Sequence, residues 1–364
     1  MDSGLGWVRV KTCQGGSGGA LCTSRKLRME DLMVTSRDVA RVAGVSQTTV
    51  SRVLTGSALV SEKTRKRVEH SLVETGYAPN AAARAMRTHR VGTIGVVVSQ
   101  ITNPFYSQLI GILGKRLIAR GLLMTVWDGG IPGEAGAVDA IRQGLVDGLI
   151  FTTATKESRA LREALLREAP LVLFNRVVEE LDCDQVSSDN RRSGEEVANF
   201  LLARGHRRIG YVAGPSDAST SVERLAGLLA ALDGSPSGEL IVHEGDYSDV
   251  HGRKALAEWF ADGVSEAPPT AVFCANDMIA VGLLDEAKRL GIRVPEDLSV
   301  VGHDDIELAS WSVFDLTSVR QPVDDMVEAA CDLLLSRIQA PGSPSRFLRF
   351  RSQIIERGST ARSS

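Results

Sequence analysis

Apolar runs and amphipathic segments alternate along the chain from Val91 onward, and this alternation limits the possible folds more than any other feature of the sequence. Runs such as TIGVVV at 93–98, VDGLIF at 146–151 and AVFCAN at 271–276 have the length of strands, and segments with helical periodicity separate them. Strands that are apolar throughout belong to parallel sheets covered by helices on both faces. The runs are sufficient for two sheets, so the sequence predicts an α/β body with two lobes.

The residues that end these runs are candidates for a ligand site, because ligands of open α/β sheets bind outside the carboxyl ends of the strands. They are polar or aromatic, as a hydroxyl-rich ligand requires. They are Asn103 to Tyr106, Asp128, Asn175, Asp189, Tyr247, Asn276 and Asp304.

The region before this body has the pattern of three short helices. Thr35 can cap a helix over SRDVARVA, the segment AGVS ends it, and Ser46 can cap a second helix over 47–54. Ser61 can cap a third helix that Gly76 ends. Two short helices joined by a glycine-containing turn are a helix-turn-helix unit. We expect a small shared core from Val39, Ala40, Val42, Ala43, Val45, Val50, Val53, Leu54, Val68 and Leu72.

The charge of this region differs from that of the whole chain. Between Met33 and Arg90 there are ten arginines and lysines and four acidic residues, a net charge of +6, whereas the complete chain carries −3. A basic module on an acidic body indicates a polyanionic partner for the module alone.

Two segments flank the helical module. Residues 1–32 are rich in glycine and serine and have no apolar period, so we expect a disordered extension, with Met29 and Met33 as alternative translation starts beside Met1. The segment AAARAMRT at 81–88 is too short to form a stable helix alone, so it is a helix that needs a partner.

Several function classes have little support. The chain has no apolar run of membrane-span length, and its first residues lack the pattern of a secretory signal, which argues against an exported sugar receptor. Its five cysteines are scattered, which indicates reduced thiols in the cytoplasm. We find no serine elbow, phosphate loop or paired metal ligands, and His303, Asp304 and Asp305 are consecutive residues that cannot all chelate one ion. We therefore expect no catalytic residue, metal or cofactor.

The chain resembles the LacI (lactose-repressor) family of bacterial transcription regulators from Val34 to about Thr360. The matching stretches include VTSRDVARVAGVSQTTVSRVL, GYAPNAAARAMRT, GHRRIGYVAG, PPTAVFCAND and RVPEDLSVVGHDDIELA. The resemblance implies a three-helix DNA-binding domain and a type I periplasmic-binding-protein-like body of two Rossmann-like lobes. The implied ranges are 33–79 for the helix-turn-helix domain, 80–90 for a hinge helix, 91–187 with 320–342 for lobe 1, and 188–319 with 343–358 for lobe 2 of an effector-binding and dimerisation domain at 91–360.

The resemblance also implies which residues contact operator DNA. Gln47 and Thr48 match the main base readers, and Arg52 lies close behind them; glutamine can read adenine, arginine guanine, and threonine the thymine methyl group. The Met86 position is usually leucine in the family, where the side chain wedges into the central base step of the operator. The full set is Thr35, Ser36, Arg37, Ser46, Gln47, Thr48, Thr49, Ser51, Arg52, Ser61, Thr64, Tyr77, Asn80, Ala83 and Met86. The alternatives are a solvated helix face and, for 81–88, an ordinary linker helix.

For the effector, the resemblance implies a cleft of polar and aromatic side chains suited to a sugar or related metabolite. These residues are Phe105, Tyr106, Asn175, Arg224, Tyr247, Asn276 and Asp304. A structural ion pair between Arg224 and Asp304 across the cleft is the alternative for these two residues.

The resemblance implies a homodimer that binds a near-palindromic operator and represses transcription under the control of a small molecule, and the scattered cysteines agree with a cytoplasmic location. A small-molecule-controlled activator or dual regulator of the same family is the alternative. The chain ends without leucine heptads, so we do not expect a tetramer through an added helical tail.

Overall fold

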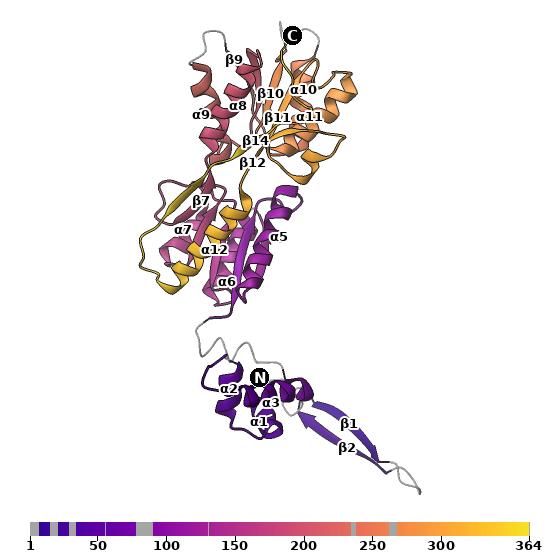
Figure 1. Cartoon of the computed structure of the whole chain (residues 1–364), viewed down its shortest axis with the longest axis vertical. Helices are drawn as coiled ribbons and strands as arrows, with labels where there is room; N and C mark the ends of the chain where they lie inside the picture. The colour runs from indigo at the N-terminus through magenta and orange to yellow at the C-terminus, as the bar shows by residue number, and fades with distance from the viewer. Residues whose placement is uncertain are drawn as a thin grey trace, which may run out of the picture. The chain divides into compact units, whose positions relative to one another are not determined.

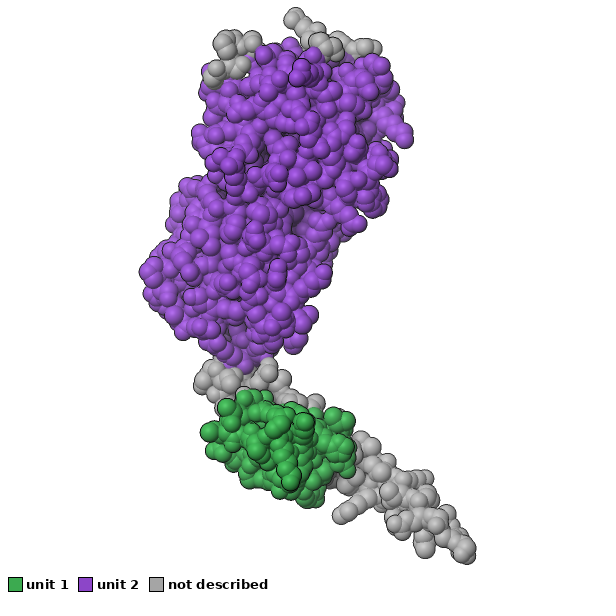
Figure 2. All heavy atoms as spheres, in the orientation of Figure 1, with its two compact units in different colours: residues 1–89 green, residues 90–364 purple. Residues whose placement is uncertain are grey.

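The computed structural model describes residues 7–14, 21–28, 34–54, 56–77, 90–129, 131–233, 238–261 and 268–363, with the first two stretches and residue 131 described as backbone alone. The chain divides into two compact units, residues 1–89 and 90–364 (Figures 1 and 2). Most of the predicted hinge, including Asn80, Ala83 and Met86, lies outside the described residues.

The expected disordered extension contains a β-hairpin. Strand β1 (Trp7–Gln14) pairs antiparallel with β2 (Leu21–Arg28), with Trp7 opposite Arg28 and Gln14 opposite Leu21. Val8, Val10 and Thr12 alternate along β1, and β-branched residues favour extended backbone. The richness in glycine and serine and the lack of an apolar period had suggested disorder, and the local strand propensity explains the difference.

Three helices follow: α1 (Ser36–Ala43), α2 (Gln47–Leu54) and α3 (Glu62–Thr75). Gly44 ends α1 in the left-handed conformation, with φ of +59°, which a glycine adopts without steric cost.

The core of these helices is smaller than the sequence predicted. Val39, Val50 and Val68 are completely buried, but Val42 is 47% exposed and Leu54 39% exposed. In helices of two turns only one stripe of residues can face the shared core. Val39, Ala40 and Ala43 form that stripe in α1, so Val42 points to solvent.

Lobe 1 contains a six-stranded sheet in the order β13-β7-β6-β5-β3-β4, in which every pair is parallel. Its strands are β3 (Thr93–Val98), β4 (Leu123–Asp128), β5 (Gly148–Phe151), β6 (Leu171–Phe174), β7 (Asp184–Ser188) and β13 (Phe347–Phe350). Its helices are α5 (Pro104–Ala119), α6 (Ile131–Arg142), α7 (Arg159–Leu166) and α12 (Val323–Gln339). Ile150 faces a cluster formed with α5 and α12, whereas Leu149 and Phe151 face a cluster formed with α6 and α7, so both faces of the sheet are buried.

Lobe 2 contains a second sheet in the order β14-β12-β11-β10-β8-β9, parallel except for the pair of β12 and β14. Its strands are β8 (Arg208–Val212), β9 (Glu239–His243), β10 (Ala271–Cys274), β11 (Ser299–Asp304), β12 (Thr317–Arg320) and β14 (Gln353–Ile355). Its helices are α8 (Asn190–Ala203), α9 (Ser219–Asp233), α10 (Asp249–Trp259), α11 (Asp277–Leu290) and the short 3-10 helix η2 (Glu307–Ser310).

Three connections join the lobes: one after β7, one after β12 and one between β13 and β14. The third lies between Phe350 and Gln353, not near residue 343 as predicted, because β13 pairs with β7 and extends the sheet of lobe 1. Within the described residues, no helix is both long and apolar enough to cross a membrane.

Candidate functional site

The polar half of α2 is exposed to solvent. Ser46, Gln47 and Thr48 at its start are exposed, and so are Ser51 and Arg52 one turn later. Val50 and Val53 are buried on the opposite face and fix α2 against its neighbours. The exposed face presents amide, hydroxyl and guanidinium groups, which are the groups that read base edges in a major groove.

Several other predicted DNA contacts form the N-terminal caps of the helices. The Thr35 backbone N and Oγ1 donate to Asp38 Oδ2 at 3.0 and 2.7 Å, and these hydrogen bonds lower the pKa of Asp38. The Ser46 Oγ accepts from the backbone N of Thr49 at 3.1 Å, and the Ser61 Oγ accepts from that of Thr64 at 3.4 Å. These residues hold the helix N-termini, which attract phosphate groups.

The remaining described candidates lie beside α2 or at the end of the unit. Gln47 Nε2 donates to the Ser36 Oγ at 2.9 Å, which links the first residue of α2 to the start of α1. Arg37 is exposed. Tyr77 packs against the helical core and is half-buried, and its backbone N donates to the Leu72 carbonyl oxygen at 3.2 Å.

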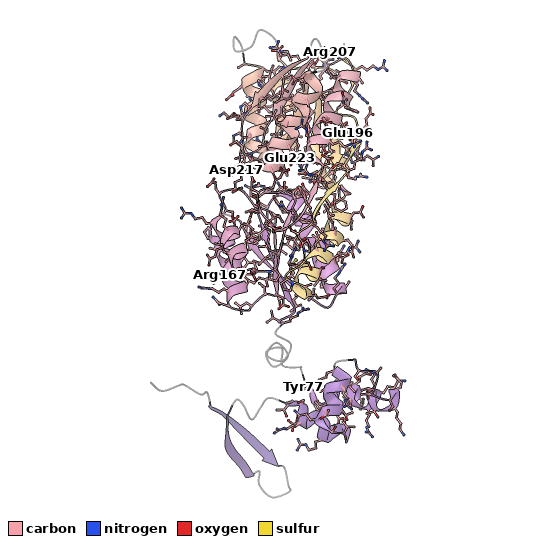
Figure 3. All side chains as sticks on the ribbon, turned by 90° about the vertical axis from the view of Figure 1, so that its left-hand side faces the viewer. Tyr77, Arg167, Glu196, Arg207, Asp217 and Glu223 are labelled. Carbon is pink, nitrogen blue, oxygen red and sulfur yellow. The ribbon has the colours of Figure 1, made fainter. Side chains whose placement is uncertain are left out.

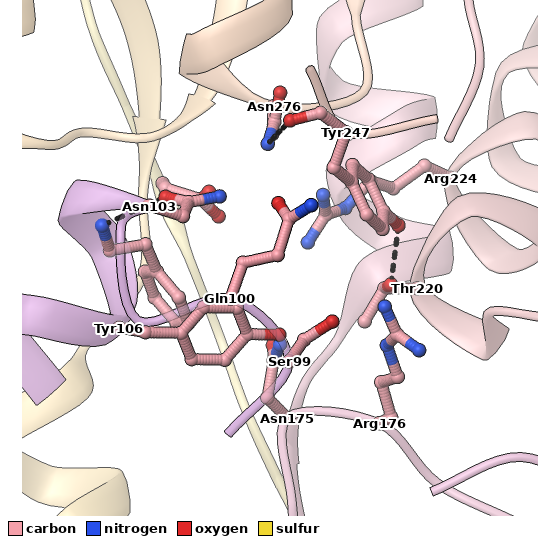
Figure 4. A pocket seen from close by; sticks show the side chains of 12 residues that line it. Ser99, Gln100, Asn103, Tyr106, Asn175, Arg176, Thr220, Arg224, Tyr247 and Asn276 are labelled. Atoms are coloured by element: carbon pink, nitrogen blue, oxygen red, sulfur yellow. Dashed lines mark hydrogen bonds between the residues drawn. The ribbon is translucent and has the colours of Figure 1, made fainter. Parts of the chain in front are cut away.

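The second candidate site is a pocket between the two lobes of the body (Figure 4). All seven side chains predicted to hold the effector line it. Asn103, one of the residues that the strand-end rule singled out, also lines it, and four further lining residues were not predicted: Ser99, Gln100, Arg176 and Thr220. Ser99 and Gln100 directly follow β3, and Arg176 follows β6 by two residues, so the rule that ligands bind beyond strand ends could have found them.

Arg224 on α9 is the most constrained polar side chain in the pocket. It is 2% exposed, its Nε donates to Asn190 Oδ1 at 2.8 Å, and its Nη1 donates to the carbonyl oxygen of Ala275. These contacts come from α8 and from the loop after β10, so they fix the direction of the guanidinium group.

Asp304 ends β11 with φ of +111°, a conformation that L-residues rarely adopt. Its Oδ1 accepts from Gln321 Nε2 at 2.8 Å and lies 3.2 Å from His303 Nδ1. In the described structure the contacts of Arg224 and Asp304 do not join these two residues, so the alternative of an ion pair across the cleft is wrong. Each of the two side chains is held by other partners.

The neighbours of Asp304 support its loop. Buried Asp277 accepts from the backbone N of Ile306 at 2.8 Å and from the Ser318 Oγ at 2.6 Å, and burial raises the pKa of Asp277 well above its usual value. Asp305 pairs with Arg320 at 2.6 Å and with Arg357 at 2.7 Å. The contacts of Asp277 and Asp305 therefore fix the conformation of the loop that follows Asp304.

His303 is completely buried, and burial lowers its pKa to about 4. Its Nε2 has no hydrogen-bond partner. It is therefore neutral at pH 7. Across the part of the chain that the structure describes, no three histidine, cysteine or acidic side chains are grouped so that they could hold a metal ion.

The other pocket residues combine amides with aromatic walls. Asn276 caps α11 by accepting from the backbone N of Ile279 at 2.9 Å, and its Nδ2 donates to the Tyr247 carbonyl oxygen at 3.3 Å. The Tyr247 hydroxyl lies 2.6 Å from that of Thr220. The rings of Phe105 and Tyr106 meet edge to face, with centroids 5.3 Å apart. Directional polar groups between aromatic faces suit a hydroxylated ligand.

Two family models match the chain. A model described as bacterial regulatory proteins, lacI family, matches residues 35–80, and a model described as a periplasmic binding protein-like domain matches residues 198–360. The ribose operon repressor of Escherichia coli (strain K12) is 33% identical over 335 residues, which are 90% of this chain and 100% of that protein. The transcriptional repressor CytR of the same strain is 34% identical over 341 residues, 92% of this chain and 98% of that protein.

Solved structures agree with these matches. The lac repressor dimer bound to operator and the anti-inducer ONPF has a TM-score of 0.78 and 28% identity, covering 90% of this chain and 99% of that chain. A LacI family regulator from Enterococcus faecium with bound ribose has a TM-score of 0.68 and 29% identity, covering 75% of this chain and 100% of that chain.

Proposed function

This chain belongs to the LacI family of bacterial transcription regulators, and from that premise we propose that it represses transcription as an operator-bound dimer controlled by a small, sugar-like molecule. The protein acts in the cytoplasm. Its helix-turn-helix domain is at 33–79, its hinge at 80–90, and its effector-binding and dimerisation domain at 91–360. The observation that carries the proposal is the pocket itself, in which seven side chains from distant parts of the sequence and from both lobes meet.

Operator binding is assigned to the exposed face of α2. Gln47 and Thr48 read bases in the major groove, with Arg52 one turn behind them. Thr35, Ser61 and Thr64 lie at helix N-termini, where backbone N–H groups and hydroxyls contact phosphates and set the register on the duplex.

Effector control follows from the position of the pocket. Tyr106 and Asn175 belong to lobe 1, whereas Arg224, Asn276 and Asp304 belong to lobe 2. A ligand that contacts both lobes stabilises one arrangement of the lobes more than another, and only such differential binding can shift a conformational equilibrium. The affinity for the operator changes because the lobe arrangement determines how the two DNA-binding modules of the dimer are presented.

A gel shift with DNA from the promoter region of its own gene tests the proposal. At moderate salt we expect a specific shift that excess unrelated DNA does not compete away, and a change in that shift when the correct ligand is added. The variants Asp304→Ala and Arg224→Ala are expected to retain the shift and lose the response to ligand. Absence of a specific shift, with or without candidate sugars, would contradict the proposal.

A further inference from the structure

Arg176 lines the effector pocket, but its hydrogen-bonding capacity is not filled. Its side chain is buried, with the residue 7% exposed, and its Nε has no hydrogen-bond partner. Its Nη1 is 3.5 Å from the carbonyl oxygen of Thr153, the outer limit of a hydrogen bond. Its guanidinium carbon lies 5.8 Å from the centroid of the Tyr247 ring. An unfilled charged donor that is removed from water is costly unless a ligand satisfies it.

The charges that line the pocket do not balance. Arg176 and Arg224 contribute two guanidinium groups, and Asp304 contributes a single carboxylate. Within the described residues neither guanidinium forms an ion pair with a carboxylate; Arg224 is held by the Asn190 amide and a carbonyl oxygen. Asn175, the residue before Arg176, has an uncharged side chain, so it does not neutralise its neighbour.

Acidic groups near the pocket are already paired elsewhere. Asp305 lies between Arg320 and Arg357. Glu223, the neighbour of Arg224, forms an ion pair with Arg349 at 3.2 Å, and Arg349 also contacts Glu179 at 2.8 Å. The pocket therefore keeps an excess of one positive charge, and Figure 4 shows Arg176 among the side chains that line it.

We infer that the effector is an anionic sugar derivative, whose carboxylate or phosphate group binds the Arg176 guanidinium and whose hydroxyl groups bind Asp304 and Asn175. This inference rests on the proposed function and specifies the ligand class of the same pocket. An anionic group satisfies the unfilled Nε donor and removes the excess charge in one contact, since guanidinium groups match carboxylate and phosphate oxygens in a bidentate geometry. The Asn175 Oδ1, which is buried without a partner, is an acceptor for a ligand hydroxyl.

Matched ligand pairs test the inference on the full-length protein. Thermal shift and calorimetry would compare glucose, galactose and ribose with the corresponding sugar acids and sugar phosphates. Inorganic phosphate and sulfate would be tested against chloride at equal ionic strength. We expect the protein to bind an anionic sugar at least tenfold more tightly than its neutral parent and to be stabilised by the inorganic anions. The sugar acids and sugar phosphates distinguish a carboxylate from a phosphate ligand.

Variants of Arg176 assign the effect to this residue. Arg176→Gln keeps a polar side chain without the charge and is expected to weaken binding of the anionic ligand about 10- to 100-fold, as expected for loss of a charged hydrogen bond, so that the preference over the neutral parent sugar is lost. Arg176→Lys, which keeps the charge, is expected to retain most of the preference for the anion. Arg167→Gln is the control, because Arg167 is an exposed lobe 1 arginine outside the pocket (Figure 3).

The outcomes separate this inference from the proposed function. A neutral sugar that binds more tightly than its anionic derivatives would overturn the inference and leave an effector-controlled repressor intact. The same conclusion follows if no organic or inorganic anion stabilises the protein, or if Arg176→Gln binds the anion as well as the unaltered protein does. Failure of operator binding in the gel shift would contradict the proposed function whatever the ligand preference.

Discussion

Gln47 and Thr48 have exposed side chains at the start of α2, so their replacement is expected to change DNA recognition without changing the core. For the double variant Gln47→Ala/Thr48→Ala we expect a loss of about 1–3 kcal/mol of discrimination at each base that a bidentate contact reads. The measurement is competition between operator variants in a gel shift. Asp304→Ala is the matched control, since it should alter ligand binding and leave operator preference intact.

An unchanged operator preference in the double variant would refute the assignment of base reading to these two residues. The thermal midpoint of the helix-turn-helix unit should change little, because surface substitutions usually alter stability by less than about 0.5 kcal/mol. The Gln47 hydrogen bond to Ser36 is exposed, so its loss adds little to that cost.

His303 is expected to make the stability of the body depend on pH. The unfolded chain binds a proton at this residue near pH 6.5, whereas the buried side chain has a pKa of about 4 in the folded protein. The unfolded state therefore binds more protons between these values, and the free energy of unfolding falls as the pH falls through this window. Between pH 7 and pH 5 the expected loss from His303 is about 2 kcal/mol.

Urea unfolding of the unaltered protein and of His303→Gln at pH 7 and pH 5 measures this contribution. The variant cannot titrate at this position, so its loss of stability over the same interval should be smaller by about 2 kcal/mol. Equal losses of stability in the two proteins would show that the pKa of His303 is not lowered in the folded state.

The pocket shows which ligand-site residues can be predicted from the sequence. The seven residues at recognisable motifs or strand ends meet in one pocket. Arg176 was missed although it lies two residues beyond β6, where the strand-end rule could have found it. Thr220 was missed because it lies on α9, and helical periodicity does not show which polar residues of a helix face a pocket.

At the scale of secondary structure, α8 and α9 approach each other closely where each helix carries a glycine. A Cβ atom at Gly227 would lie 1.8 Å from the Arg191 carbonyl oxygen, and one at Gly194 would lie 2.1 Å from that of Arg224. The clashing atoms are backbone carbonyl oxygens of the facing helix, so the two helices would have to move apart to make room for either Cβ atom. Gly227→Ala is therefore expected to destabilise the protein by about 1–3 kcal/mol and to weaken effector binding, since α9 positions Arg224.

Gly111 in α5 provides the matched control, because a Cβ atom there would meet nothing within 4 Å beyond the backbone of its own helix. Gly111→Ala is expected to raise the free energy of unfolding by about 0.5–1 kcal/mol through helix propensity alone. The two variants would be compared by chemical unfolding. Equal stability of Gly227→Ala and the unaltered protein would mean that the helix pair can separate without cost.

The strands differ in how well their sequences predict them. β3, β5 and β10 are apolar throughout, and the alternation of such runs with helices predicts the two-lobed body. Strand β7 was not predicted, because its sequence DQVSS is polar although all five residues are buried. Its polar groups are satisfied locally: Asp184 pairs with Arg337 at 2.9 Å, and the Ser187 Oγ donates to the Asn175 carbonyl oxygen at 2.9 Å. Burial of a polar strand depends on such tertiary partners.

At the scale of the whole molecule, the proposed function requires two copies of the chain. A single helix-turn-helix unit reads one half-site, and symmetric operators are bound by dimers. Sedimentation is therefore expected to give about twice the chain mass of 39.0 kDa at micromolar concentration. A stable monomer under these conditions would contradict the dimer.

Communication between the pocket and the operator is expected to be reciprocal. If a ligand lowers operator affinity by a given factor, thermodynamic linkage requires that the operator lowers ligand affinity by the same factor, typically about 5- to 150-fold. The first factor is measured by titrating operator DNA with and without saturating ligand. The second is measured by titrating ligand with and without saturating operator, at the same salt concentration. Unrelated DNA is the control.

The equality of the two factors is a sharper test than either affinity alone. The ligand contacts both lobes. If its affinity is equal for both lobe arrangements, it does not change the affinity for the operator, however tightly it binds. Arg176→Gln should therefore weaken ligand binding and leave the coupling factor nearly unchanged if Arg176 contacts the ligand equally in both arrangements. A large fall in that factor would instead assign Arg176 to the residues that distinguish the arrangements. Absence of any coupling in the unaltered protein would separate the pocket from the control of transcription.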